Sequence, residues 1–295
     1  MKKIIITLVV ILATALAAGS LYAVAGDLVR TIGENRALKG SGNIVTRTVD
    51  VGSFRGVKAF SCARVTLVKG SGPVTVKVDD NLLEYLHVKV EKGTLRIGLK
   101  NNEERTGFSN FNDVTLEVTV PSNGEIGELK TSGAARIVAE PILTADDIDL
   151  DASGASKIVA MVECRKCGLD ASGASQIEAG GVADICEADA SGASKISLAI
   201  RAKRCDLDAS GASKIAAQGS ADRCDLDASG ASSIDAEALK TADATAESSG
   251  SSSVRLYCTR SLKASASGAG KIAYRCDGPV SLSTNSSGAG RIKQL

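Results

Sequence analysis

The sequence predicts an all-β protein: a right-handed single-stranded parallel β-helix preceded by a β-layered head. Two observations carry this prediction. A phrase close to Ser-Gly-Ala-Ser-Lys-Ile occurs nine times from Ser132 onward, and the five copies from Ser153 to Ser229 are 19 residues apart. Around each copy, apolar and polar residues alternate, which is the period of a β-strand. A near-constant period of this length is typical of stacked repeats.

Equivalent positions of the repeats form columns of one residue type. Five residues after the motif serine stand Ile137, Ile158, Ile177, Ile196, Ile215, Ile234, Val254, Ile272 and Ile292. One repeat cannot bury such residues alone, but stacked repeats can, with neighbouring strands about 4.8 Å apart. We therefore expect these nine side chains to form a continuous internal spine.

Each repeat is expected to contain two strands and two bends. Residues 205–210 are typical of the first strand, and residues 214–216 of the second. The motif glycine between them suits a tight bend because it lacks a Cβ atom. A polar segment such as 218–222 is predicted to be a turn that closes the coil.

The N-terminal part has a different organisation. A basic start, an apolar run over 4–18 and small residues up to Ala25 predict a signal peptide at 1–25, with an uncleaved anchor as the alternative. Residues 26–39 are interpreted as a linker. Alternating segments over 40–128 predict the β-rich head, with one helical turn near 81–86, and 129–295 form the β-helix. No transmembrane helix is expected after cleavage.

Several segments resemble the GIN domain family of exported Bacteroidota proteins. They are Gly40-Ser41-Gly42-Asn43, Val57-Lys58-Ala59-Phe60, 74–83, 93–97, Val118-Thr119-Val120-Pro121 and the Ser-Gly-Ala-Ser repeats. The resemblance runs from about residue 40 to the end. It implies a β-helical protein exported to the periplasm, the outer-membrane surface or the medium. Family members are described as heads of auto-transporter adhesins, so adhesion is implied by analogy, without a known active site.

Four cysteines recur every 19 residues: Cys167, Cys186, Cys205 and Cys224. They are predicted to stack inside the helix as a ladder of buried thiols. Disulfides between neighbouring coils are the alternative, since adjacent strands lie within disulfide range and the compartment is oxidising if the chain is exported. A metal or redox role is the third reading, because Cys164 and Cys167 form a Cys-x-x-Cys sequence, although no second pair completes a zinc site.

Acidic residues form two outward columns. Asp189, Asp208 and Asp227 belong to one, and Asp206 and Asp225 to the other. Stacked carboxylates repel one another, so something must neutralise them. These five aspartates are candidate calcium ligands. The alternative is a solvated surface with ion pairs between coils, and the repeat lacks the nonapeptide of calcium-binding β-rolls.

The composition argues against two classes of function, nucleic-acid binding and catalysis. A net charge of +1 and 3% aromatic residues argue against nucleic-acid binding. His87 is the only histidine and has no evident catalytic partner, so we expect no catalytic residues and no cofactor.

We expect a non-enzymatic envelope protein that binds a surface protein or glycan through a flat β face. A polysaccharide-active β-helix enzyme and a periplasmic structural or sensor protein are the alternatives. An exposed last coil around Arg291 also suggests end-to-end or edge-to-edge oligomers.

Overall fold

The computed structural model describes residues 38–100 and 111–295. The predicted signal peptide, 1–25, and nearly all of the predicted linker lie outside these residues. One unit contributes a short parallel pair, β1 (Leu38–Lys39) with β8 (Phe111–Asn112). The other unit, 41–100 and 114–295, contains the rest of the described chain. In the described residues no helix has the length and apolar character needed to cross a membrane.

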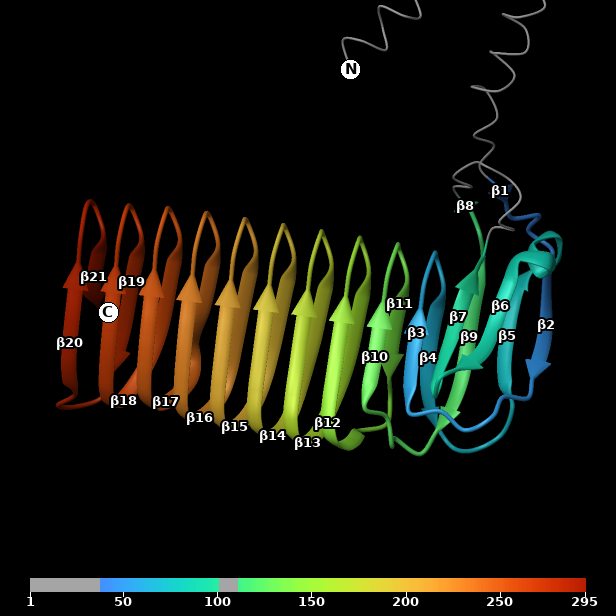
Figure 1. Cartoon of the computed structure of the whole chain (residues 1–295), viewed down its shortest axis with the longest axis horizontal. Helices are drawn as coiled ribbons and strands as arrows, with labels where there is room; N and C mark the ends of the chain where they lie inside the picture. Colours follow the sequence, from blue (N-terminus) through green and yellow to red (C-terminus); the bar gives the residue numbers. More distant parts are fainter. Residues whose placement is uncertain (1–37, 101–110) are drawn as a thin grey trace, which may run out of the picture. The chain divides into compact units, whose positions relative to one another are not determined.

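A β-solenoid of about nine turns occupies residues 128–294 (Figure 1), so the predicted all-β parallel β-helix is confirmed. Its strands are β10 (Glu128–Thr131), β11 (Arg136–Ala139), β12 (Leu143–Ala152), β13 (Lys157–Ala171), β14 (Gln176–Ala190), β15 (Lys195–Ala209), β16 (Lys214–Ala228), β17 (Ser233–Ser248), β18 (Ser253–Ala266), β19 (Lys271–Cys276), β20 (Ser281–Ser286) and β21 (Arg291–Gln294). All pairs between these strands are parallel.

The predicted spine is present. Each of its members pairs in register with its counterpart in the next coil, as Ile196 does with Ile177 and Ile215. From Ile137 to Ile272 these side chains are at most 1% exposed. Ile292 is partly exposed because its strand, β21, pairs only with β19. Burial of this column removes apolar surface from water along the stack, which is the main driving force for packing the coils.

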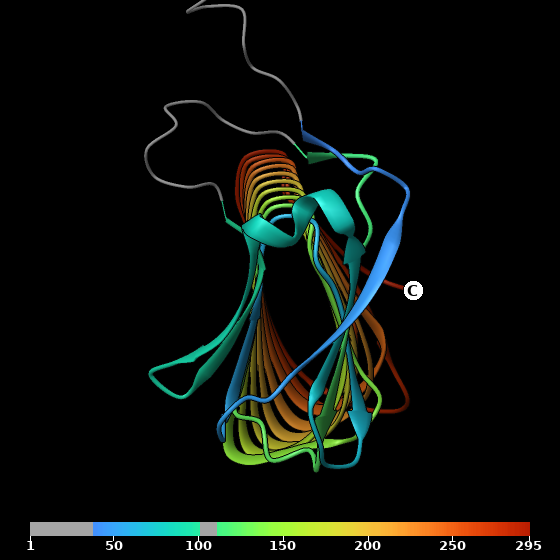
Figure 2. The same cartoon turned by 90° about the vertical axis from the view of Figure 1, so that its right-hand side faces the viewer.

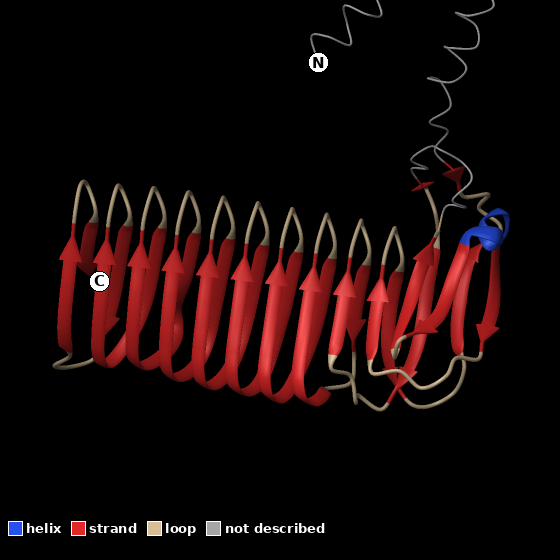
Figure 3. Ribbon diagram, in the orientation of Figure 1, coloured by secondary structure: helices blue, strands red, loops and turns tan. Residues whose placement is uncertain are grey.

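The motif glycines of the repeats lie in the bends between strands, and these bends form one edge of the stack (Figure 3). Gly211 has φ +71°, and a Cβ atom added there would lie 2.9 Å from the carbonyl oxygen of Gly192. That oxygen accepts a hydrogen bond of 2.7 Å from the amide of Ala212. The close stacking of the turns therefore requires glycine at this position.

The second serine of the motif is buried beneath the bend. Ser213 Oγ donates to the carbonyl oxygen of Ala190 at 2.9 Å, and the same bond recurs in neighbouring coils. A buried hydroxyl without a partner would be costly. The hydrogen bond satisfies it and ties each coil to the one before.

The predicted polar turn at 218–222 is not a loop. Gln218 to Ala221 lie within β16 and pair with Ala199 to Ala202 of β15. The hydrogen bonds to neighbouring coils satisfy this backbone, so the polar residues need no loop. The change of direction is concentrated at Gly219, with φ +115°, and at Asp222, which the ladder skips.

A mixed β-sheet precedes the solenoid at the end facing the viewer in Figure 2. Its strands are β2 (Ile44–Val49), β3 (Gly56–Ala59), β4 (Arg64–Lys69), β5 (Val74–Asp79), β6 (Leu86–Glu91), β7 (Thr94–Leu99) and β9 (Leu116–Ser122). The 3-10 helix η2 (Asp80–Tyr85) connects β5 to β6. The helical turn predicted near 81–86 corresponds to η2.

β3 and β4 form a further coil in register with the repeats. β3 pairs in parallel with β7 and β10, and β4 with β9 and β11. Ser61 stands at the glycine position of this coil, with φ +63°. The solenoid ladder thus continues into the segment that the sequence assigned to the head.

Two substitutions at the glycine position of the bend, in different coils, are expected to change the stability in opposite directions. Gly211→Ala should lower the free energy of unfolding by at least about 1–2 kcal/mol, the cost of a left-handed conformation for a residue with a Cβ atom. Ser61→Gly should raise it, by up to about 1 kcal/mol, because it relieves that cost. Urea unfolding of both variants measures these changes. Equal stability of Gly211→Ala and the unchanged chain would contradict the steric account.

Candidate functional site

The outer faces beside the glycine bend carry stripes of charge. Before the bend runs the acidic stripe, which we define as Asp151, Asp170, Asp189, Asp208, Asp227 and Glu247. Its members pair in register from coil to coil. After the bend, Arg136, Lys157, Lys195 and Lys214 lie in a basic column that Gln176 interrupts. The regular stacking thus separates the two signs of charge on either side of the bend.

The second acidic column is partly neutralised by cations. Arg204 Nε lies 2.9 Å from Asp206 Oδ1, and its Nη2 lies 3.3 Å from Asp225 Oδ2 in the next coil. Lys166 Nζ lies 2.8 Å from Glu187 Oε2. The pairs Arg204–Asp225 and Lys166–Glu187 are ion pairs between coils, which the sequence suggested as the alternative to calcium.

The acidic stripe itself has less compensation. In the described part of the chain, Lys130 pairs with Asp151 at 3.1 Å, whereas Asp170, Asp189 and Asp208 make no ion pair. Burial raises the pKa of these three carboxyls, and neighbouring carboxylates raise it further. These neighbours belong to the stripe at Asp170 and, in the main, at Asp208, whereas at Asp189 they are Glu187 and Asp206 of the second column. Ionisation of these three groups at neutral pH therefore opposes folding.

The five calcium candidates do not converge on one point. Asp189, Asp208 and Asp227 follow one column, and Asp206 and Asp225 follow the other and bind Arg204. Within 38–100 and 111–295, no group of three His, Cys, Asp or Glu side chains is arranged to hold a metal ion. The ion-pair hypothesis accounts for the second column, and calcium binding stays a prediction.

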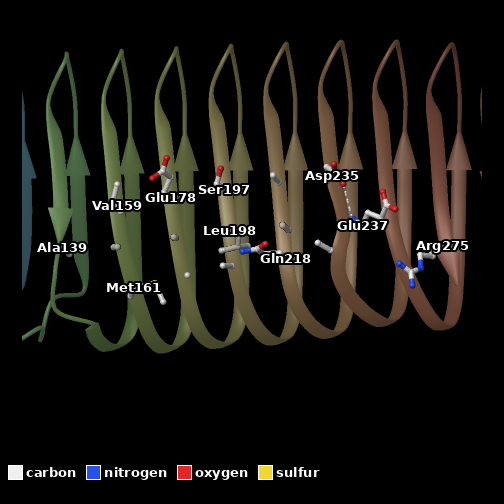
Figure 4. Close-up of a pocket in the computed structure, with 17 residues that line it drawn as sticks. Ala139, Val159, Met161, Glu178, Ser197, Leu198, Gln218, Asp235, Glu237 and Arg275 are labelled. Atoms are coloured by element: carbon white, nitrogen blue, oxygen red, sulfur yellow. Dashed lines mark hydrogen bonds between the residues drawn. The ribbon is translucent and has the colours of Figure 1, made fainter. Parts of the chain in front are cut away.

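An open groove of about 830 Å³ crosses the coils after the bend (Figure 4). Its floor is made of small and apolar residues, namely Val159, Met161, Gly180, Ala199 and Ala216. Met161 is 48% exposed, which is unusual for a large apolar side chain. The groove is therefore a hollow with a mostly small and apolar lining and a few polar groups, which is typical of ligand-binding sites.

A break in the repeat shapes one end of the groove. β17 contains an extra residue, so pairing shifts from Ala216 with Asp235 to Gln218 with Ala238. Such a bulge redirects the side chain at the extra position. Here Glu237 lines the groove and forms an ion pair with Arg255 of the next coil. The backbone amide of Glu237 donates a hydrogen bond of 3.3 Å to Asp235 Oδ1.

The sequence reasoning missed this groove. The signal was the column eight residues after the motif serine, where Met161, Gly180, Ala199 and Gln218 stand. The other outward columns carry charges, and this one is small or apolar over three consecutive coils. His87 lies outside the groove: it is half-buried, its Nε2 is 3.3 Å from Glu91 Oε1, and burial lowers its pKa.

All eight cysteines are free thiols in the structure. Cys167, Cys186, Cys205 and Cys224 are at most 1% exposed and pair in register, as the ladder hypothesis predicts. Burial raises the pKa of the Cys224 thiol well above its ordinary value. The four side chains thus pack as small apolar groups in the core.

The model of the family described as "Putative auto-transporter adhesin, head GIN domain" matches residues 53–198 and 183–278. The chain belongs to this family. The predicted resemblance is confirmed, and the match extends over both the mixed sheet and the solenoid. Comparison with curated proteins gives no match.

Several solved structures share the fold of this chain. A "putative adhesin" from Parabacteroides distasonis ATCC 8503 is 22% identical to this chain, with a TM-score of 0.68. A "Putative lipid binding protein" from the same strain is also 22% identical, with a TM-score of 0.65. Each alignment covers 88% of this chain and 100% of the other. A "putative adhesin" from Parabacteroides merdae ATCC 43184 is 21% identical with a TM-score of 0.61, covering 88% and 99%. At this identity the likeness establishes the fold alone.

Removing one charge from the middle of the acidic stripe should stabilise the protein at neutral pH. An aspartate whose pKa is higher in the folded chain than in the unfolded chain destabilises the fold at a pH above both values, and this penalty is lost as the pH falls through the folded-state pKa towards the unfolded-state pKa. Asp189→Asn should therefore raise the melting temperature at pH 7 by about 1–3 °C, the scale of a surface charge. This gain should shrink as the pH falls towards 4.

Asp225→Asn is the matched control, because Asp225 binds Arg204 and its removal should give no gain. Melting both variants with and without calcium also tests the metal hypothesis. A calcium-dependent rise that Asp189→Asn abolishes would support calcium binding and contradict uncompensated repulsion.

Proposed function

We propose that this protein is an exported, non-enzymatic binding protein of the cell envelope that attaches to its partner through the groove of the solenoid. Membership of an adhesin-head family supports adhesion. The observation that carries the proposal is the apolar groove, which spans coils from Ala139 to Arg275 on one regular face. An extended face of this kind suits recognition of an extended partner.

The polar groups of the groove are held by neighbours rather than poised for chemistry. Glu178 Oε1 accepts hydrogen bonds from Lys157 at 2.6 Å and from Gln176 at 2.8 Å. Glu237 is bound to Arg255. Glycoside hydrolysis requires a pair of carboxyl groups free to exchange protons with a substrate. The polysaccharide-active alternative is therefore less well supported than binding, and none of the three relatives above has a description that names an enzyme.

The partner that fits best is a surface protein or glycan that presents a flat apolar patch. A second candidate is a lipid, with its acyl chain along Val159, Met161 and Ala199. The open apolar floor favours it, and one relative of similar fold is described as a "Putative lipid binding protein". Either partner would be met outside the cytoplasm, in agreement with the predicted signal peptide.

A charged side chain on the floor of the groove should abolish binding. Ala199→Arg places a cation in the middle of the apolar floor, and we expect at least a tenfold loss of affinity. Ala193→Arg is the matched control, because it makes the same change in the same coil at the exposed bend, away from the groove. The protein lacking residues 1–25 is tested on arrays of matrix proteins and glycans and on phospholipid vesicles.

The outcomes separate the candidates. Binding to a protein or glycan that only Ala199→Arg weakens supports adhesion through the groove, and binding to vesicles with the same pattern supports the lipid. Equal loss in both variants would place the binding surface elsewhere. The absence of micromolar binding to every probe would leave adhesion without support.

A further inference from the structure

The Cys-x-x-Cys sequence at 164–167 lies at a corner of the solenoid. The strand ladder pairs Cys164 with Ala145 and Ala183 of the neighbouring coils, and it resumes at Lys166, but it skips Arg165. The chain therefore turns at Arg165. The turn brings Cys164 and Cys167, which would be far apart on a straight strand, to one corner of the coil.

Ion pairs fix the corner from outside. Arg165 lies 3.2 Å from Asp146 Oδ2 and 2.5 Å from Asp147 Oδ1 in the coil before. Lys166 is bound to Glu187 in the coil after. Both residues between the cysteines are thus anchored to neighbouring coils, which holds the two thiols in a defined relation.

The two thiols are electrostatically coupled and differ in exposure. Cys164 is partly exposed, whereas Cys167 is buried. Interaction with Cys164 and with Cys186 of the next coil lowers the pKa of Cys167, and interaction with Cys167 together with burial raises the pKa of Cys164.

We propose that Cys164 and Cys167 form a reversible disulfide by exchange with a small disulfide oxidant. Cys164, the accessible thiol, passes its proton to the Cys167 thiolate as it attacks one sulfur of the oxidant RSSR. The released RS⁻ then takes that proton and restores the Cys167 thiolate. The Cys167 thiolate then attacks the Cys164 sulfur and releases the second RS⁻. The two protons lost by the cysteines convert both leaving groups to RSH, so one disulfide is exchanged for another.

Exposure favours this pair over disulfides between coils. Cys167, Cys186, Cys205 and Cys224 are stacked at the spacing of neighbouring strands, about 4.8 Å, which lies within the Cα–Cα range of a disulfide. All four are shielded from any reagent, so none of them can begin the exchange with the oxidant. Cys164 and Cys167 are related by a turn, and Cys164 is partly exposed.

Peptide mapping tests the proposal directly. The full chain is equilibrated in glutathione buffers from reducing to oxidising, its free thiols are alkylated, and it is digested with trypsin. Because trypsin cuts after Arg165 and Lys166, the peptide with Cys164 separates from the peptide with Cys167 and Cys186 unless a disulfide joins them. We expect the joined peptides in the majority of molecules in oxidising buffer and in few in reducing buffer.

Two variants identify which cysteines are joined. Each introduces an alanine, which already stands at the equivalent position of another coil. Cys164→Ala matches Ala183 in the next coil and should abolish the link, whereas Cys186→Ala, which matches Ala244 in its own column, should leave it. Alkylated Cys164 in every buffer would overturn the proposal, as would a disulfide between Cys167 and Cys186. Because the assay uses purified protein and no partner, its failure would leave the proposed groove function untouched.

Discussion

The hydrogen bonds between successive glycine turns set the spacing of the whole solenoid. In each turn the carbonyl oxygen of the motif glycine accepts the amide two residues after the motif serine of the next coil, as in the 2.7 Å bond from Ala193 to Gly173. No Cβ atom fits between the turns, because the backbone atoms are already 2.9–3.2 Å from where it would lie in Gly192. Every coil is therefore placed on the last at one distance and in one register.

One fixed register has consequences for every column. It aligns the isoleucines into a spine, and it equally aligns aspartates that repel each other. The chain offsets part of this repulsion by alternating sign at the outer corner, where Asp146, Arg165, Asp184, Lys203 and Asp222 follow one another at 19-residue intervals. Lys203 reaches Asp184 at 2.8 Å, and Arg165 reaches Asp146. The acidic stripe lacks such alternation, so nearby carboxylates add to the effect of burial in raising the pKa of Asp170, Asp189 and Asp208.

The parts of the structure that follow the repeat could be predicted from sequence. The spine, the glycine bend and the buried cysteines are local patterns repeated many times, so noise at one position does not obscure them. The coil formed by β3 and β4 was not predicted, because Ser61 stands where the glycine should be and long segments separate this coil from its neighbours in the stack. The strand at 218–221 was mistaken for a turn, since polar composition does not reveal hydrogen bonds to another coil.

The groove was missed for a different reason, which bears on how such a protein acquires a site. A repeat that is uniform presents the same surface on each coil, so a distinct site arises only where the sequence departs from its own period. Gly180 and Ala199 remove side chains from an outward column, and the extra residue of β17 redirects Glu237 to the end of that column. Each departure leaves the core columns unchanged, because strand alternation puts outward and inward residues on separate positions. The solenoid can therefore change its surface coil by coil without loss of the stack that supports it.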